Sequence, residues 1–251
     1  MTPTHFDKVR PTYIENWSAA LAQLSIPQTD IPLSLAEARA LAERNLGRRG
    51  HPAGEPDPHV SAVAERLESA LAAYREGAFV RLGSRSAKDS RFARLHGLRV
   101  LNSDAAIRML TGDSRRIAYD LGLALRHGYA PHVFARRWYE IPAWAEFRCF
   151  MKGRELVGVS QYDCRNLGRR PEIAERAGEI KAAIEEFSER VGAAAHLADF
   201  VFDVFLNFGE AGRGRAARVT LLELNPFLPA TDACLFSWRD GGDFDGSFRF
   251  L

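Results

Sequence analysis

The stretch DFVFDVFLN, from Asp199 to Asn207, is followed after a polar turn by VTLLELNPFLPATD, from Val219 to Asp232. Both runs are apolar and typical of strands, yet each carries an acid that packing does not require, Asp203 in the first and Glu223 in the second. Residues i and i+2 of a strand face the same side, so Glu223 and Asn225 project together. If the two runs pair as a hairpin, Asp203 lies beside them. Two carboxylates and an amide oxygen on one face are ligands suited to Mg²⁺ bound with phosphates.

Spacing alone leaves two interpretations of these acids open. Carboxylates embedded in apolar strands have a pKa raised by desolvation, and a bound cation removes that penalty. Alternatively, strict alternation places the acids on the solvent side of a half-exposed sheet. The residues by themselves favour neither interpretation.

Composition excludes several classes of protein. The chain has 251 residues, 46% hydrophobic and 26% charged, which is ordinary for one large globular domain or two small ones. A net charge of +2 gives no argument for nucleic-acid or membrane partners. No apolar run approaches the roughly 18 residues that span a bilayer, and MTPTHFDKVRPTY lacks a signal-peptide core. Cys149, Cys164 and Cys234 form no C-x-x-C motif, so we expect free thiols and a cytoplasmic protein.

The first part of the chain is predicted to be a helical extension. Helices are expected over 16–25 and 34–45, and Ser34 with Glu37 forms the sequence signature of a capping box. The segment GRRGHPAGEPDP, 47–58, is rich in Gly and Pro and predicts an exposed loop. We therefore expect residues 1–58 to form an N-terminal extension.

The remaining elements indicate α+β layers rather than a doubly wound sheet. A periodic helix is expected over 60–76, a strand over 78–82, a small-residue loop over 83–90, helices over 103–110 and 114–127, and extended chain over 132–141. The run AEFRCFMKGRELVGVSQYD predicts a hairpin joined at Lys152 and Gly153, and a long helix is expected over 172–191.

A set of cations could hold phosphates, because guanidinium groups bind them with paired donors. These cations are Arg81, Arg85 and Lys88 around the loop GSRS, together with Arg136, Arg137 and Arg148. For any single arginine a structural role is the commoner one, and Arg148 shares a strand face with Glu146, which allows a plain ion pair. As a set they favour phosphate binding, since several lie in strand-like or small-residue contexts.

Aromatic residues near the second group of cations have two interpretations. Trp138 and Tyr139, with Phe134 and Ile141, could line an adenine slot, since pockets are mostly apolar. Core packing is the simpler interpretation for Phe134 and Ile141. The segment GEAGRGR, 209–215, is not a phosphate loop, because it lacks the Lys-Ser/Thr ending and joins two strands.

Four segments in unbroken order resemble the cell division cycle protein 123 family, a divergent branch of the ATP-grasp fold. They are FVRLGSRSAKDS, RRWYEIPAWAEFRCFMKGRELVGVSQYD, DFVFDVFLN and LLELNPFLPATDACLFSW, which span about Phe79 to Trp238. The resemblance implies two α+β subdomains, expected over 59–140 and 141–251, with an ATP and Mg²⁺ site between them. Eukaryotic members of the family help to assemble a translation initiation factor.

The resemblance also implies roles for individual residues. Arg81 falls where the family has a phosphate-contacting lysine, and Lys88 with Asp89 matches a pair in the following loop. The segment Arg136–Glu140, which holds Arg137, Trp138 and Tyr139, matches the frame of the adenine. Glu146 and Arg148 match an EFR motif with Arg148 facing the phosphates. The metal ligands are matched by Asp203, Glu223 and Asn225.

Besides Arg81 in place of a lysine, three further departures from the family bear on function. Glu223 stands where the eukaryotic members have aspartate, and working ATP-grasp ligases usually carry glutamate there. Tyr162 replaces an arginine of the family, which leaves open whether this position contacts the substrate or a phosphate. Residues 1–58 do not resemble the eukaryotic N-terminal region. The sequence therefore gives no reason to assign the initiation-factor role of the eukaryotic members to this chain.

These observations predict an Mg-ATP-binding protein. The leading expectation is a ligase in which a carboxylate is phosphorylated by ATP and the acyl phosphate is attacked by an amine, with Arg148 and Glu223 as catalytic residues. Its carboxylate and amine, or protein, substrates are not identified by the sequence. The alternative is a non-catalytic, ATP-dependent assembly factor for a protein partner. A nucleotide-free interaction module is a third hypothesis.

Overall fold

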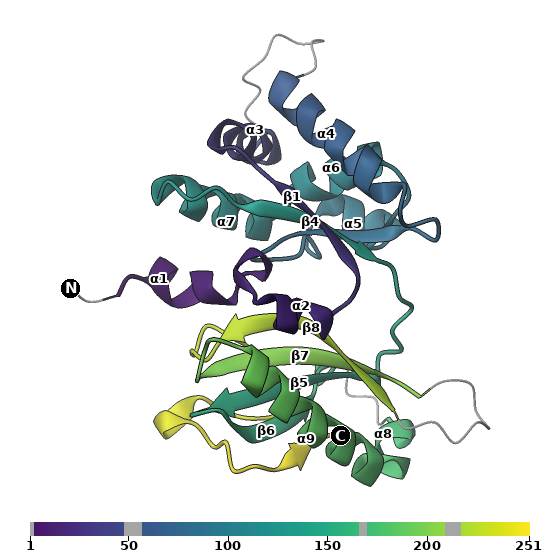
Figure 1. The fold of residues 1–251 in the computed structure, drawn as a ribbon, viewed down its shortest axis with the longest axis vertical. Helices are drawn as coiled ribbons and strands as arrows, with labels where there is room; N and C mark the ends of the chain where they lie inside the picture. The colour runs from purple at the N-terminus through teal and green to yellow at the C-terminus, as the bar shows by residue number, and fades with distance from the viewer. Residues whose placement is uncertain (1–2, 48–56, 166–169, 209–216) are drawn as a thin grey trace. The chain divides into compact units, whose positions relative to one another are not determined.

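The computed structural model describes residues 3–47, 57–165, 170–208 and 217–251 (Figure 1). The chain divides into two compact units: unit 1 comprises Met1–Ile26 and Glu140–Leu251, and unit 2 comprises Pro27–Tyr139. Most of the expected loop 47–58 and the whole of the segment GEAGRGR lie outside the described residues.

Unit 2 is built on a four-stranded antiparallel sheet in the order β1-β4-β2-β3. Its strands are β1 (Gln28–Pro32), β2 (Ala78–Leu82), β3 (Arg99–Val100) and β4 (His132–Arg137). Its helices are α3 (Leu35–Asn45), α4 (Pro58–Leu71), α5 (Arg91–His96), α6 (Ser103–Thr111) and α7 (Arg115–Arg126).

The helices of unit 2 begin where the sequence supplies caps and pack on one face of the sheet. The capping box expected at Ser34 and Glu37 is confirmed, and Ser90, Asn102 and Ser114 cap α5, α6 and α7. Alternation along β2 and β4 sends small and aliphatic residues into the helix-covered core. The opposite face of the sheet therefore carries the other set: Phe79 and Arg81 on β2, and Phe134 and Arg136 on β4.

Unit 1 is built on a five-stranded sheet in the order β8-β7-β5-β6-β9, in which only the β6–β9 pair is parallel among the described strands. Its strands are β5 (Glu146–Lys152), β6 (Glu155–Gln161), β7 (Phe200–Asn207), β8 (Arg218–Pro226) and β9 (Phe248–Arg249). Its helices are α1 (His5–Val9), α2 (Ala19–Gln23), α8 (Pro171–Glu175) and α9 (Ala177–Ala194), with short 3-10 turns at Arg10–Thr12, Ile14–Asn16 and Arg239–Gly241.

The two faces of this sheet are covered differently. Helix α9 contacts β6 and β8 and buries Ile180, Ile184, Phe187 and Val191 (Figure 1). An aromatic cluster from the chain after β8 packs against Phe150 with its rings 4.7 to 6.2 Å away. The cluster consists of Phe236, Trp238 and Phe244.

The first 58 residues are divided between the two units instead of being set apart. The segment QTDIP forms β1, which pairs with β4 inside the sheet of unit 2, whereas residues up to Ile26 belong with unit 1. The long helix expected over 172–191 is two helices, because the backbone of Arg176 leaves helical geometry (φ −115°, ψ 14°) between α8 and α9. The hairpins β5–β6 and β7–β8 are confirmed. Within the described residues, none of the helices combines the length and the apolar character needed to cross a membrane.

Candidate functional site

A row of polar residues crosses the sheet of unit 1 at one level. Arg148 on β5 lies opposite Ser160 on β6 and opposite Asp203 on β7, and Asp203 lies opposite Glu223 on β8. Directly opposite residues of antiparallel strands share a face, so these four side chains form one continuous line. Three of them, Arg148, Asp203 and Ser160, are at most 5% exposed. Buried polar side chains in an apolar sheet lower the stability of the fold unless they form hydrogen bonds or ion pairs with one another.

The centre of this row is a two-pronged ion pair. Arg148 Nε donates to Asp203 Oδ1 at 2.8 Å, and Arg148 Nη2 donates to Asp203 Oδ2 at 2.7 Å. Arg148 Nη1 donates to the carbonyl of Asp232 at 2.9 Å, and the ring of Tyr162 lies 5.0 Å from the guanidinium carbon. Paired donors match the planar carboxylate, so the pair holds both side chains in one orientation.

A β-bulge brings Glu223 into the row. Asp203 pairs with Glu223, but the next residue of β7, Val204, pairs with Leu221, so Leu222 is the extra residue of β8. Without the bulge Leu222 would oppose Asp203 and Glu223 would face the other side of the sheet. Asn225 Nδ2 lies 3.3 Å from Glu223 Oε1 and 3.5 Å from Asp203 Oδ2. The acids and the amide expected to share a face are therefore brought together.

Burial governs the electrostatics of the pair. Burial raises the pKa of Asp203 to about 6, against the opposing effect of Arg148, and the nearby Glu223 carboxyl raises this pKa further. Burial lowers the pKa of Arg148, but the Asp203 carboxylate outweighs burial and leaves this pKa raised. Burial also raises the pKa of Tyr162, so its phenol stays neutral. At neutral pH the row carries a charged pair with the second acid, Glu223, beside it.

The donor set of this cluster fits Mg²⁺. Carboxylate and amide oxygens are the hard ligands that Mg²⁺ takes when phosphates complete its coordination. Glu223 and Asn225 are half-buried, so the cluster is accessible from one side, and a half-turn of the Asn225 amide exchanges its nitrogen for its oxygen. No group of three or more His, Cys, Asp or Glu suited to a metal occurs in the described part of the chain. A cation here would therefore need the Asn225 oxygen or the phosphates themselves.

Two contacts of Arg148 were not expected from the sequence. The Asp232 carbonyl accepts from Arg148, although in the sequence Asp232 only ends the apolar run. Tyr162, where the family has an arginine, places its ring over the guanidinium. A tyrosine thus stacks on a cation at the position where the resemblance implies an arginine. In the sequence Asp232 lies six residues after the end of β8, and this position by itself does not predict a contact with Arg148.

The expected cations of unit 2 lie on one face of its own sheet. Arg136 on β4 lies opposite Phe79 on β2, and Arg81 on β2 lies opposite Phe134 on β4, so the two arginines are diagonal neighbours on the face opposite the helix-covered core. Arg81 is 3% exposed and Arg136 1%. Arg81 Nε donates to the carbonyl of Leu82 at 3.0 Å. The two arginines therefore share a sheet face, and their phosphate role stays a prediction.

The loop after β2 contains groups that serve the structure of unit 2. Asp89 accepts from Ser114 Oγ at 2.6 Å and from the Arg116 amide at 3.2 Å, so it secures the start of α7. Arg85 pairs with the buried Asp120 at 3.2 Å. Burial raises the pKa of Asp120, and Arg85 opposes that shift. Lys88 in the same loop is exposed, and its phosphate role stays a prediction.

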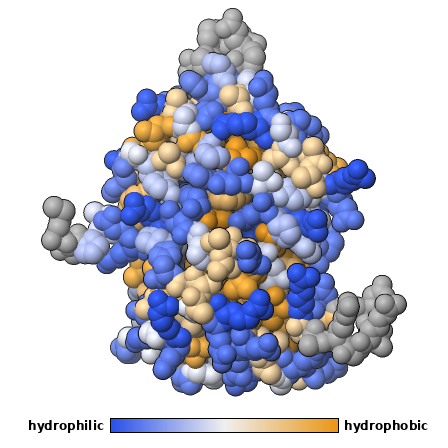
Figure 2. All heavy atoms as spheres, viewed as in Figure 1, coloured by the Kyte–Doolittle hydropathy of each residue, from blue (hydrophilic) through white to orange (hydrophobic). Residues whose placement is uncertain are grey.

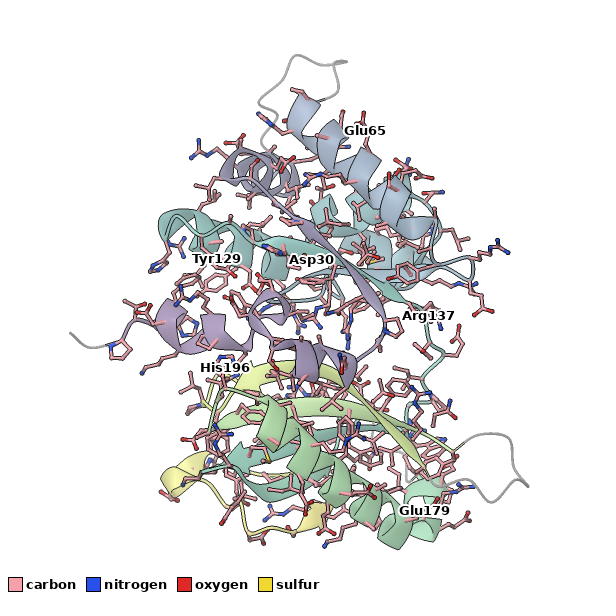
Figure 3. The ribbon with its side chains drawn as sticks, viewed as in Figure 1. Asp30, Glu65, Tyr129, Arg137, Glu179 and His196 are labelled. Atoms are coloured by element: carbon pink, nitrogen blue, oxygen red, sulfur yellow. The ribbon has the colours of Figure 1, made fainter. Side chains whose placement is uncertain are left out.

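The remaining expected residues follow β4 or begin β5. Arg137 is exposed at the end of β4, where Figure 3 labels it, and Trp138 and Tyr139 after it are half-buried. Phe134 is buried and stacks on His132 with ring centroids 6.3 Å apart, in keeping with core packing. Glu146 begins β5, half-buried and two residues before Arg148. Arg148 forms its ion pair across the sheet with Asp203 rather than along its own strand.

Comparison with known proteins supports the fold. A model of the D123 family matches residues 35–242. The structure of Cdc123 from Schizosaccharomyces pombe superposes with a TM-score of 0.76, covering 95% of this chain and 92% of that one at 20% identity. This likeness confirms the α+β, ATP-grasp fold class expected from the sequence.

Sequence relatives carry names related to translation initiation or to the cell division cycle. A Xenopus tropicalis protein named translation initiation factor eIF2 assembly protein is 35% identical over 106 residues, which is 42% of this chain and 29% of that protein. A Yarrowia lipolytica protein named cell division cycle protein 123 is 33% identical over 136 residues, which is 52% of this chain and 34% of that one. These matches therefore span only about a third of the length of the relatives.

Proposed function

This chain belongs to the D123 family, and on that premise we propose that it is an Mg-ATP-binding factor that assists the assembly of a protein partner. Nucleotide binding is the chemical part of this proposal, and the protein partner is its biological part. The two parts rest on different observations and are tested separately.

The observation that carries nucleotide binding is the buried polar row of unit 1. Arg148, Asp203 and Glu223 occupy consecutive positions across a sheet whose neighbouring residues are almost all apolar and buried. Replacing a buried ion pair with apolar residues of similar size often stabilises a protein, so packing gives no reason for the row. A role in binding a cation and phosphates gives one.

Each residue would contribute a specific interaction. Asp203, Glu223 and Asn225 supply oxygens to Mg²⁺, and Arg148 orients Asp203 for that task. Bound Mg²⁺ would neutralise phosphate charge. Arg81, Lys88 and Arg136 are the candidate donors to phosphates, since guanidinium and ammonium groups bind phosphate through charge-assisted hydrogen bonds. The adenine would lie against Trp138 and Tyr139, with Arg137 and Glu146 at its edges.

The names of the relatives favour an assembly role over catalysis. The proteins with the matching sequences are named as assembly proteins for the initiation factor eIF2, which implies a protein partner for those proteins. For this chain we propose the same kind of activity, in which bound nucleotide stabilises the conformation that a partner recognises. The partner itself is left open, because the matches span a minor part of the relatives.

One residue favours a second candidate function, an ATP-dependent ligase. Glu223 stands where the eukaryotic members have aspartate, and ligases of the ATP-grasp fold usually have glutamate there. In that case ATP would phosphorylate a carboxylate, and an amine would displace phosphate from the acyl phosphate. Arg148 and Glu223 would then be catalytic by stabilising charge on the transferring phosphoryl group directly and through the metal.

Calorimetric titration with ATP tests the nucleotide part. We expect ATP to bind in the presence of Mg²⁺ and at least about tenfold more weakly with EDTA, since one lost charge-assisted contact corresponds to about 1.5 kcal/mol or more. Asp203→Asn, Glu223→Gln and Asn225→Ala should each reduce the Mg²⁺-dependent affinity. Glu155→Gln is the matched control, because Glu155 is an exposed acid on β6 of the same sheet. Undiminished affinity in Asp203→Asn and Glu223→Gln would show that the metal assignment is wrong.

Turnover separates the two candidate functions. An assembly factor should bind ATP and release little ADP or AMP, whatever small carboxylates and amines are added. A ligase should release ADP or AMP only when an acceptor is present, and Glu223→Asp should slow that release while leaving binding intact. Acceptor-dependent turnover would overturn the assembly proposal.

A further inference from the structure

Unit 1 carries a pair of cysteines outside its polar row. Figure 2 shows hydrophilic and apolar residues interspersed over the face that carries α2 and α9, as on an ordinary solvated surface. Cys164 and Cys234 lie instead just after β6 and in the segment that follows β8, and both are half-buried. We infer that these two thiols form an oxidisable pair, which a peroxide joins into a disulfide that ties the segment after β8 to the end of β6.

Both cysteines approach one backbone oxygen. The Cys164 amide donates to the Tyr162 carbonyl at 2.9 Å, and Cys234 Sγ lies 3.9 Å from the same oxygen. The second contact joins two residues that are 72 positions apart in the chain. The fold therefore places the two cysteines next to each other, which is the precondition for a disulfide.

Electrostatics also places the two sulfur atoms close together. Burial raises the pKa of the Cys234 thiol, Arg148 opposes that shift, and a Cys164 thiolate raises this pKa further. The effect of Cys164 exceeds that of the Asp203 carboxylate, although Asp203 is only 1% exposed and its charge is therefore weakly screened. Because electrostatic effects fall with distance, Cys164 lies nearer to Cys234 than Asp203 does.

Hydrogen bonds from the backbone on both sides of Cys234 hold this residue over the end of β6. The Cys234 amide donates to Asp232 Oδ1 at 3.0 Å, and the Leu235 amide donates to Ser160 Oγ at 3.2 Å. Cys234 has a φ of 53°, a left-handed conformation that costs a cysteine energy and persists only where its surroundings impose it. The carbonyl of Asp232, in the same segment, accepts from Arg148. A disulfide at Cys234 would therefore fix the segment that contacts the buried ion pair.

The two thiols have different parts in the oxidation. The raised pKa of Cys234 keeps its thiol protonated, so Cys164 is the thiol that meets the peroxide first. The Cys164 sulfur attacks one peroxide oxygen, the O–O bond breaks, and water leaves while Cys164 becomes a sulfenic acid. The Cys234 sulfur then attacks the Cys164 sulfur, the S–O bond breaks, and the hydroxide leaves as water with the proton of the Cys234 thiol. One peroxide and two thiols thus give one disulfide and two waters.

Mass spectrometry after treatment with hydrogen peroxide tests the pair. The chain has three cysteines, so Cys149→Ala leaves only Cys164 and Cys234, and any bridge within this variant must join them. We expect the folded variant to lose two hydrogens and both alkylatable thiols, and to regain them with dithiothreitol. Peptide mapping of the wild-type chain should find the same bridge, which covers the case of a poorly folded variant. Oxygen addition without a bridge, or a disulfide between two chains, would overturn the proposal.

Single-cysteine variants test the order of the two steps. Cys149→Ala with Cys234→Ser leaves Cys164 alone, and we expect peroxide to give a sulfenic acid that dimedone traps. Cys149→Ala with Cys164→Ser leaves Cys234 alone, and trapping should be at least tenfold slower, because the thiolate is the form that attacks the peroxide. Equal rates of trapping at the two positions would overturn the assigned order.

Urea denaturation tests whether the folded chain accepts the bridge. A disulfide that fits the native geometry constrains the unfolded chain, so the oxidised protein should unfold at a higher urea concentration than the reduced protein. Cys164→Ser and Cys234→Ser should each show no such shift after the same treatment. A lower midpoint in the oxidised wild type would mean that the bridge strains the fold, which would overturn the proposal. None of these measurements uses nucleotide, so their outcome is independent of whether the chain binds Mg-ATP.

Discussion

Arg148 on β5 lies directly opposite Asp203 on β7, and two hydrogen bonds of 2.8 and 2.7 Å join their side chains in the buried centre of the sheet. Removing only the cation would leave a carboxylate without its counter-charge in a site that is 1% exposed. We expect Arg148→Met to lower the free energy of unfolding by about 3–5 kcal/mol, measured by urea denaturation.

The same experiment has an internal comparison. Arg165 pairs with Asp232, but its side chain is 83% exposed, so Arg165→Met should change stability by about 1 kcal/mol or less. The double variant Arg148→Met with Asp203→Leu should recover part of the loss, because both charges are then gone. Equal effects of the Arg148 and Arg165 changes would mean that the buried pair contributes no more than a surface pair.

The pKa of Asp203 makes stability depend on pH. Burial raises this pKa from 3.8 to about 6 in the folded protein, so the folded state holds the proton more tightly than the unfolded chain. The unfolding free energy should therefore fall as pH rises from about 4 to about 6. Denaturation at a series of pH values in this window measures it. Asp203→Asn should remove this part of the slope, and parallel pH profiles for the two proteins would contradict the assignment.

Much of the local structure follows from the sequence because it rests on short-range rules. The strand β2 was expected over its observed residues, and the capping box at Ser34 and Glu37 marks the start of α3. The strand β1 was missed for a physical reason. QTDIP contains four polar or proline residues among five, and it forms a strand only by pairing with β4, about a hundred residues later.

The candidate site was partly predictable for similar reasons. Alternation placed Glu223 and Asn225 on one face, and apolar flanks indicated that β7 and β8 pair. The bulge at Leu222 could not be read from the sequence, although it puts Glu223 opposite Asp203. The ion pair between Arg148 and Asp203 was also unexpected, because it depends on the register of two strands 55 residues apart. The sequence predicts that Arg148 contacts phosphates and that Asp203 binds a metal. In the structure the two side chains form an ion pair with each other.

Thiol chemistry provides an independent check on the core of unit 1. Cys149 on β5 is fully buried, and burial raises the pKa of its thiol well above its ordinary value. Cys164 and Cys234 are half-buried. Because the thiolate is the reactive form, we expect an alkylating reagent to label Cys149 only after unfolding, as followed by mass spectrometry. Cys149→Ala should lose one label in urea and none under native conditions, and labelling of Cys149 as fast as Cys164 would show that this sheet opens readily.

Gly158 on β6 sets how closely the aromatic cluster approaches the sheet. A Cβ atom at this position would lie 2.7 Å from Phe236 Cζ, and the ring of Phe236 packs against both Phe150 and Phe244, whose centroids are each 5.3 Å away. The ring therefore has little room to move, and we expect Gly158→Ala to destabilise the protein by about 1–3 kcal/mol in urea denaturation.

Gly178 in α9 is the matched control, since a Cβ there meets nothing within 4 Å. Gly178→Ala should leave stability unchanged or raise it by up to about 1 kcal/mol. Adding Phe236→Leu to Gly158→Ala should relieve the clash, and a Gly158→Ala protein as stable as the wild type would show that the cluster does not pack against β6 as described.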